Sequence, residues 1–446
     1  MIMAVEGVIN SDSNNLESPY GDSIYLSLRH QPKSKAAISS VNLIAADITA
    51  RARTLSNHKE IVGAIVADLL RGQSLFPPQP CYRAMNNASF TGFHHGYKPF
   101  VAVRNGLVGK GYLRFVRGQQ PFDDIPGKVS RFHSTDKLIL LLSAAGITPA
   151  SFSEHFGVRT DIPLVHNSVR LKTASTRGSW PKIHGKPMTV KPSAEVVQLE
   201  EEVHQINEFL RQQNFDGMLF DGLFRSFNEG DQRGFDWNKG GRLYAVGGGF
   251  QAIDKYKERP LIRINGEATV EVDICASHLT IFHALMKTPL PGSGDPYSTG
   301  EIGRNGVKLF CAITLGSGKI PSQWSPNARE DYLKDYNKRV RNGLPLSGET
   351  GDLPKDYPFR QVREIAIRHI PLLKSVEGSG ITWADFQFLE SQILIKSINN
   401  LITEGIPTLP LHDSLISRQS DSERVSQVII RNFKDRMGER CYTKIK

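Results

Sequence analysis

The sequence lacks paired cysteines and long apolar runs, and each absence excludes a class of protein. Its four cysteines are scattered through 446 residues without a C-x-x-C pair, so neither a zinc ribbon nor a disulfide framework is supported. The longest apolar stretch, residues 138–147, is far too short to cross a bilayer. The first residues lack the basic and apolar regions of a secretory signal. We therefore expect a cytoplasmic protein without a membrane partner.

Two common catalytic motifs are also missing. The run LGSGKI (315–320) resembles the end of a P-loop, but Ile313 stands where the first glycine is needed and Ile320 where Ser or Thr is needed. The consecutive residues His412, Asp413 and Ser414 do not form a catalytic triad, because neighbours on a strand or tight turn point in alternating directions. Neither a P-loop nor a triad is therefore expected.

Positive charge is what the chain has in excess. It carries 55 Lys and Arg against 45 Asp and Glu, a net charge of +10 at pH 7. Such an excess favours polyanionic partners, of which nucleic acid is the first candidate. With 39% hydrophobic residues the chain can bury a sizeable core, and its length suggests two or three domains.

The N-terminal part is predicted to hold a flexible segment and a small basic domain. Residues 1–35 are polar and expected to be flexible. Residues 36–160 begin with helical periodicity over 36–72 and continue with a β-rich hairpin from Tyr97 onward. An apolar helix capped by Ser134 or Thr135 follows. A basic hairpin and helix are typical of a winged-helix-like nucleic-acid contact, and a small α/β domain with a solvated basic face fits equally well.

The C-terminal part is predicted to be mostly helical at first and mixed afterwards. Residues 161–234 contain an amphipathic helix over 193–214, with Ser193 as its cap. Residues 235–446 alternate strand-like and helix-like segments. The expected fold class is therefore α+β.

Two aspartates are predicted to stand where strands end. Asp273 follows the alternating run 269–272 and precedes a helix, and Asp413 lies at the tip of a hairpin. Each has an ordinary explanation when taken alone: Asp273 as a helix cap, Asp413 as part of a polar turn. Together, in a basic protein, they fit a site for two divalent cations, which phosphoryl transfer onto a 3′-hydroxyl requires.

Two further segments supply groups for phosphates and backbones. Arg304 and Lys308 are four residues apart and are expected on one face of a helix, either to hold a triphosphate or as a solvated face. The segment 235–253 is rich in glycine, which permits close backbone approach, and carries Arg242 and Gln251.

The order of these segments resembles the palm and fingers of family A DNA polymerases and of phage-type single-subunit RNA polymerases. GGRLYAVGGGFQAI places Arg242 31 residues before Asp273, and VEVDICASHL resembles motif A. Arg304 and Lys308 match the Arg-x-x-x-Lys of motif B, while His412-Asp413-Ser414 resembles motif C. The resemblance covers residues 195–440 and implies a right-hand fold, with a thumb-like region over 161–234 and palm and fingers over 235–446.

The resemblance also implies partners, cofactors and residue roles. The chain would extend a nucleic-acid 3′-hydroxyl as a DNA polymerase, using DNA template and primer, nucleoside triphosphates and two Mg²⁺ ions, or Mn²⁺ in their place. It would then be associated with the nucleoid. The implied metal ligands are Asp273, Asp413 and the carbonyl of Ile274. The implied nucleotide-binding residues are Arg304, Lys308 and His278, and Lys308 would also donate a proton to pyrophosphate. The implied primer–template contacts are Arg242, Gln251 and His412.

Two departures from the family leave its substrate open. Leu315-Gly316 stands where motif B ends in an aromatic-Gly pair, and His278 stands where DNA polymerases of the family carry a glutamate that excludes the ribose 2′-hydroxyl. A single-subunit RNA polymerase or primase is therefore the nearest alternative. A non-enzymatic replication initiator with a degenerate palm and a metal-dependent nuclease are alternatives of other classes. The sequence indicates no oligomeric state.

Overall fold

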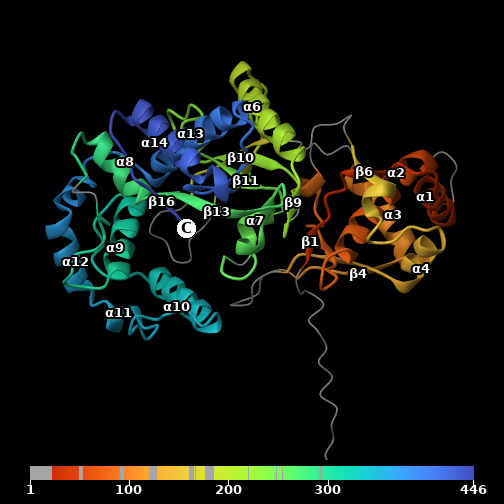
Figure 1. Cartoon of the computed structure of the whole chain (residues 1–446), viewed down its shortest axis with the longest axis horizontal. Coiled ribbons are helices and arrows are strands. Elements are labelled where there is room, and N and C mark those ends of the chain that lie inside the picture. The colour runs from red at the N-terminus through yellow and green to blue at the C-terminus, as the bar shows by residue number, and fades with distance from the viewer. Residues whose placement is uncertain are drawn as a thin grey trace, which may run out of the picture. The chain divides into compact units, whose positions relative to one another are not determined.

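The computed structural model divides the chain into two compact units that mix helices with sheets. It describes residues 23–49, 54–90, 95–119, 128–159, 165, 167–175, 185–218, 220–247, 249–253, 255–290 and 294–446. The units comprise residues 1–162 and 163–446 (Figure 1). The α+β class is confirmed. Within the described ranges, no helix is long and apolar enough to cross a membrane.

The N-terminal unit consists of helices around a four-stranded sheet of order β1-β3-β5-β4 and a two-stranded sheet of β2 and β6. Its elements are β1 (Ile24–Tyr25), β2 (His30–Pro32), α1 (Lys35–Ile48), α2 (Leu55–Gln73), β3 (Cys81–Tyr82), α3 (Tyr97–Gly109), β4 (Leu113–Val116), β5 (Arg131–Ser134), α4 (Asp136–Ala144), α5 (Phe152–His155) and β6 (Phe156–Val158). Thr135 caps α4 by accepting a hydrogen bond from the Leu138 amide, as predicted.

The segment from Tyr97 to Gly109 is helix α3, so the prediction that it is β-rich is wrong. Its buried residues Phe100, Val103 and Leu107 follow helical spacing. Gly106 lies against α1, because a Cβ placed there would come within 2.9 Å of the Ile48 Cβ. Close helix packing therefore overrides the strand preference of the valines. The hairpin consists of β4 and β5 instead, and part of its connection lies outside the described residues.

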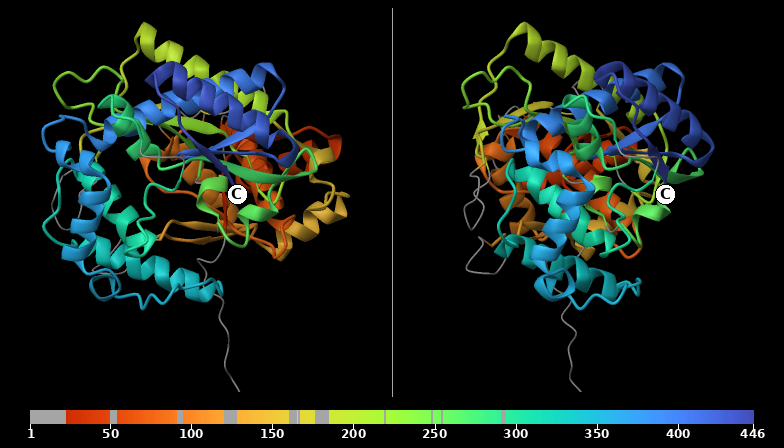
Figure 2. Two further views of the ribbon diagram at one scale, coloured as in Figure 1. Left: turned by 60° about the vertical axis from the view of Figure 1, so that its left-hand side comes forward. Right: turned by 90° about the vertical axis from the view of Figure 1, so that its left-hand side faces the viewer.

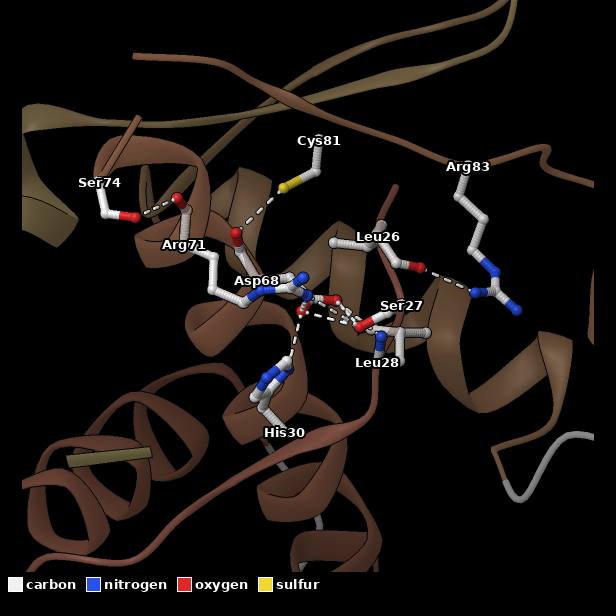
Figure 3. A network of polar contacts seen from close by, with 9 residues as sticks. All are labelled: Leu26, Ser27, Leu28, His30, Asp68, Arg71, Ser74, Cys81 and Arg83. Atoms are coloured by element: carbon white, nitrogen blue, oxygen red, sulfur yellow. Dashed lines mark hydrogen bonds and ion pairs between the residues drawn. The ribbon is translucent and has the colours of Figure 1, made fainter. Parts of the chain in front are cut away.

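Residues 23–35 are part of the N-terminal unit, which differs from the expectation of a flexible segment, whereas residues 1–22 lie outside the described part. Figure 3 shows this stretch around Asp68, a fully buried carboxylate on α2. Asp68 accepts hydrogen bonds from the Leu28 amide at 2.6 Å and the Ser27 hydroxyl at 3.0 Å, and contacts Arg71 Nη1 at 3.0 Å and His30 Nδ1 at 3.2 Å. Burial alone would raise the Asp68 pKa, but His30 and Arg71 hold it below its usual value.

We expect the N-terminal unit to lose stability as the pH falls from about 6.5 to 4. His95 is buried, and burial together with Arg159 and Arg29 lowers its pKa to about 4. The unfolded chain therefore takes up this proton at higher pH than the folded one, which costs at most about 3 kcal/mol by pH 4. Urea unfolding followed by circular dichroism should give a flatter pH profile for His95→Gln over this window. Parallel profiles for both proteins would contradict the assignment.

The C-terminal unit contains two main sheets, of order β14-β15-β13-β12-β9, with β16 also paired to β13, and of order β11-β10-β7-β8. Its strands are β7 (Val169–Lys172), β8 (Pro187–Met188), β9 (Phe215–Asp216), β10 (Leu223–Phe227), β11 (Gly240–Ala245), β12 (Arg263–Ile264), β13 (Glu267–Ile274), β14 (Thr408–Leu411), β15 (Ser414–Arg418) and β16 (Thr443–Ile445). Its helices are α6 (Ala194–Arg211), α7 (Gly249–Ala252), α8 (Ser277–Leu285), α9 (Arg304–Ser317), α10 (Pro326–Arg341), α11 (Leu353–Asp356), α12 (Phe359–His369), α13 (Trp383–Thr403) and α14 (Ser422–Met437).

One large hydrophobic core joins these helices to the sheets. Helix α14 packs on β13, β15 and β16, and α13 packs beside it and along β11 (Figure 2). Helices α9 to α12 gather on one side of the β13 sheet, at the left and below it in Figure 1. Ser193 caps helix α6, since its hydroxyl accepts a hydrogen bond from the Val196 amide, so the predicted cap is confirmed. The predicted boundary at residue 234 falls between β10 and β11, which are paired strands of one sheet.

Candidate active site

Asp273 lies near the end of β13, and Asp413 lies beside it in the turn just before β15, the strand that pairs with β13. Strands β13 and β15 are antiparallel, and Asp273 is in register with Ser414. Asp413 precedes Ser414 in the turn from β14, and its carbonyl accepts a hydrogen bond from the Ile274 amide at 3.1 Å. Residues 140 positions apart in sequence are thus neighbours in space because one strand pairing holds both.

The explanation of Asp273 as a helix cap does not fit the geometry, whereas Asp413 does lie in a polar turn. Helix α8 begins after Ala276 without a side-chain cap, so Asp273 does not cap it. Ser414 is fully buried, and its hydroxyl lies 2.9 Å from a Glu271 carboxylate oxygen and 2.9 Å from the Leu411 carbonyl. It therefore faces the sheet interior rather than His412, which agrees with the exclusion of a triad.

Both aspartates have raised pKa values. Burial and the charge of Asp413 raise the pKa of Asp273, and burial together with Glu390 raises the pKa of Asp413. One of the two carboxylates already contacts a positive group, since Lys446 Nζ lies 2.6 Å from Asp273 Oδ2. Two close carboxylates with raised pKa values suit a divalent cation, whose binding would relieve their repulsion.

The protein itself supplies few ligands at this edge. Across the described ranges, no group of three or more His, Cys, Asp or Glu side chains converges as a metal site. Mg²⁺ binds through one or two carboxylates together with waters and substrate phosphates. A pair of carboxylates is within what Mg²⁺ takes from a protein.

Helix α9 presents Arg304 and Lys308 to solvent while its other face packs into the core. Arg304 is the first residue of the helix and forms an ion pair with Asp295. Lys308 lies one turn later, is exposed, and has no side-chain partner in the part of the chain that the structure describes. Its charge acts on Asp273, where it opposes the rise in pKa. Lys308, whose charge acts on Asp273 less strongly than that of Lys446, is thus free to bind an anion.

A buried carboxylate that the sequence reasoning missed, Glu390 on α13, connects Arg242 to α8. Glu390 is fully buried. Its Oε1 accepts from Arg242 Nε at 2.7 Å, and its Oε2 accepts from the Ser277 hydroxyl at 2.7 Å. Arg242 Nη2 in turn lies 3.3 Å from His278 Nε2. Glu390 therefore fixes the direction of Arg242 and the start of α8, just after Asp273.

His278 stands beside this cluster as a neutral ring. It stacks on Phe386 with ring centroids 5.4 Å apart. Burial, helped by Arg242, lowers the pKa of His278 to about 4. At neutral pH its Nε2 can therefore accept the hydrogen bond from Arg242, and the ring offers shape and an acceptor rather than charge.

The remaining predicted site residues lie near the pair in different ways. The Gln251 side chain binds two backbone groups: its Nε2 donates to the Pro410 carbonyl at 2.7 Å, and its Oε1 accepts from the Ala245 amide at 3.1 Å. It thereby ties β11 to β14. His412 is exposed in the turn with a φ of 55°, and Ile274 is fully buried in β13. Roles of Gln251 and His412 at a primer–template and of the Ile274 carbonyl at a metal stay predictions.

Comparison with known proteins adds little to this geometry. No protein-family model and no curated protein matches the sequence. Among solved structures, the POL domain of Pol1 from M. smegmatis, in complex with DNA primer-template and dNTP, is similar with 16% sequence identity and a TM-score of 0.26. The match spans 46% of this chain and 45% of that chain. A likeness this slight shows nothing about the activity of this chain.

Proposed function

We propose that the chain is a template-directed nucleotidyltransferase, a DNA polymerase of the family A type that extends a nucleic-acid 3′-hydroxyl. The observation that carries the proposal is the adjacency of Asp273 and Asp413 at one strand edge, with the unpaired cation of Lys308 acting on it. This is the arrangement of charges that joining a triphosphate to a hydroxyl requires: carboxylates for metal ions and a cation for the leaving phosphates.

Each residue then has a task that follows from its position. Asp273 and Asp413, with the Ile274 carbonyl, would hold two Mg²⁺ ions. When bound, these ions lower the pKa of the attacking hydroxyl and neutralise charge on the departing pyrophosphate. Arg304 and Lys308 would bind the triphosphate, and Lys308, as an ammonium, can give a proton to the pyrophosphate oxygen. Lys446 would release Asp273 when the cation binds.

The groups around Arg242 would position the nucleic acid and the sugar. Glu390 holds Arg242 in place, so that its guanidinium edge stays at the site. His278 would lie against the sugar of the incoming nucleotide and select it by shape. Gln251 on α7 and His412 in the turn after β14 would contact the primer–template.

Extension of a labelled primer on a DNA template, with Mg²⁺ and each set of triphosphates in turn, tests the proposal. We expect incorporation of dNTPs, reduced by about 10³-fold or more in Asp273→Asn and in Asp413→Asn, because each loses a metal ligand. Asp435→Asn, an exposed aspartate on α14, is the matched control and should keep full activity. Undiminished extension by both site variants would overturn the proposal.

The same assay separates the alternatives. Incorporation of NTPs without a primer would indicate an RNA polymerase or primase, which the His278 position allows. Shortened strands would indicate a nuclease. Salt-sensitive DNA binding with no change in strand length, retained in both aspartate variants, would indicate a non-enzymatic initiator.

A further inference from the structure

One face of the β7–β10–β11 sheet has a composition that packing does not explain. The opposite face lies against α6: Leu223 and Phe227 are fully buried, and Arg225 forms an ion pair with Glu202 of α6 at 2.7 Å. Because side chains alternate along a strand, Phe224 and Ser226 of β10 point to the other face. That face carries a row of polar side chains and a row of aromatic ones.

The polar row crosses three strands in register. Ser226 is paired with Arg170 of β7 on one side and with Arg242 of β11 on the other. The Ser226 side chain is only 2% exposed, yet its hydroxyl has no hydrogen-bond partner among the described residues. A buried hydroxyl without a partner is unfavourable. A ligand oxygen placed between the two arginines would provide the missing partner and lie beside the guanidinium of Arg170, whereas the charge of Arg242 is already paired with Glu390.

The aromatic row lies two residues further along the same strands. Phe224 and Tyr244 are in register and stacked, with ring centroids 5.8 Å apart and an interplanar angle of 26°. Arg170 reaches back over Phe224, with its guanidinium carbon 3.4 Å from the ring centroid. On the other side, Tyr244 meets His412 edge to face at 6.5 Å. The row thus leads from β7 to the turn that carries Asp413.

We propose that this face binds a single strand of nucleic acid, the template on its way to the carboxylate pair. The Arg170–Ser226–Arg242 row would hold a backbone phosphate, and when Arg170 turns to that phosphate a base would take its place over the Phe224 ring in the Phe224–Tyr244 row. The two rows are two residues apart along the strands, roughly 7 Å. Basic side chains interleaved with aromatic rings are the usual combination for single strands, whereas a duplex hides the faces of its bases. The proposal rests on the proposed function for the identity of the strand as template.

The test measures binding and needs no catalysis. Fluorescence anisotropy with labelled oligo(dT) and with a duplex of equal length gives the ratio of the two affinities for the full chain. We expect Phe224→Leu and Tyr244→Leu to weaken oligo(dT) binding roughly tenfold, with little effect on the duplex, because they remove stacking surfaces. Tyr244→Phe keeps the ring and should bind as the unchanged chain does. Arg170→Gln should lower the slope of log K against log salt by about 0.7.

Ser226→Ala separates a loss of binding from a loss of folding. It removes a hydroxyl that has no partner in the protein, so its thermal stability should not fall, whereas its affinity for oligo(dT) should. Tyr256→Leu is the matched aromatic control, since Tyr256 lies under Lys255 Nζ at 4.5 Å from its ring centroid and is on none of the three strands of this face, and it should leave the ratio of affinities unchanged.

Three results would overturn the proposal: unchanged oligo(dT) binding in the folded Phe224→Leu and Tyr244→Leu variants, an equal loss of duplex binding, or unchanged oligo(dT) binding in Ser226→Ala. A chain that binds oligo(dT) through this face but does not extend a primer would contradict the proposed function and leave the binding face standing.

Discussion

Glu390→Ala is expected to lower the free energy of unfolding by about 3–5 kcal/mol. The carboxylate is fully buried and accepts hydrogen bonds from Arg242 and Ser277, so its removal leaves a guanidinium and a hydroxyl without partners in a region of low dielectric. Urea unfolding followed by circular dichroism measures the loss. Nucleotide incorporation should fall as well, because Arg242 would no longer be fixed beside α8.

Two comparisons isolate the buried ion pair. Glu404 forms a two-point ion pair with Arg424, but this pair is on the surface, and Glu404→Ala should cost far less. Replacing Glu390 and Arg242 together by methionine removes both charges, and this double variant should recover much of the stability lost in Glu390→Ala. Equal losses for Glu390→Ala and Glu404→Ala would mean that Glu390 is not the buried anchor described above.

The strands and helices that carry the candidate site were largely predictable, because their local sequence patterns are strong. The alternating run before Asp273 and the apolar run after Ser277 give β13 and α8, and the short apolar segments around His412-Asp413 give the β14–β15 hairpin. The spacing of Arg304 and Lys308 placed both on one face of α9. In each case the signal lies within about a dozen residues, and local propensity and tertiary packing agree.

The rest depended on contacts between distant segments. Glu390 lies in the apolar run of α13, at helical spacing from buried Phe386 and Ile393, and that spacing was the available sign of burial. Its partner Arg242 is 148 residues away, so the sequence did not reveal the pairing. Lys446 reaches Asp273 because β16 pairs with β13, and Ser226 falls between two arginines because of strand register. Patterns along the chain predict elements, but not which strands pair.

Lys308→Met should lower the kcat of nucleotide incorporation by about 10²–10⁴-fold, the usual range for loss of a general acid. Lys308 is exposed, has no side-chain partner in the described structure, and acts on Asp273, so its charge is available to the leaving phosphates. Lys308→Arg keeps the charge but not a proton that can be given up near neutral pH, so it should restore triphosphate affinity more than kcat. Single-turnover kinetics separate the two effects.

Arg304 and Lys319 provide the matched comparisons for Lys308. Arg304 is partly neutralised by Asp295, so Arg304→Met should raise KM more than it lowers kcat. Lys319 is exposed just beyond the other end of α9, and Lys319→Met should change neither constant. If Lys308→Met lost no more activity than Lys319→Met, the proton donor would have to be another group. If it raised KM alone, Lys308 would bind the triphosphate without taking part in the chemical step, because an interaction that is equally strong in the ground state and the transition state does not change kcat.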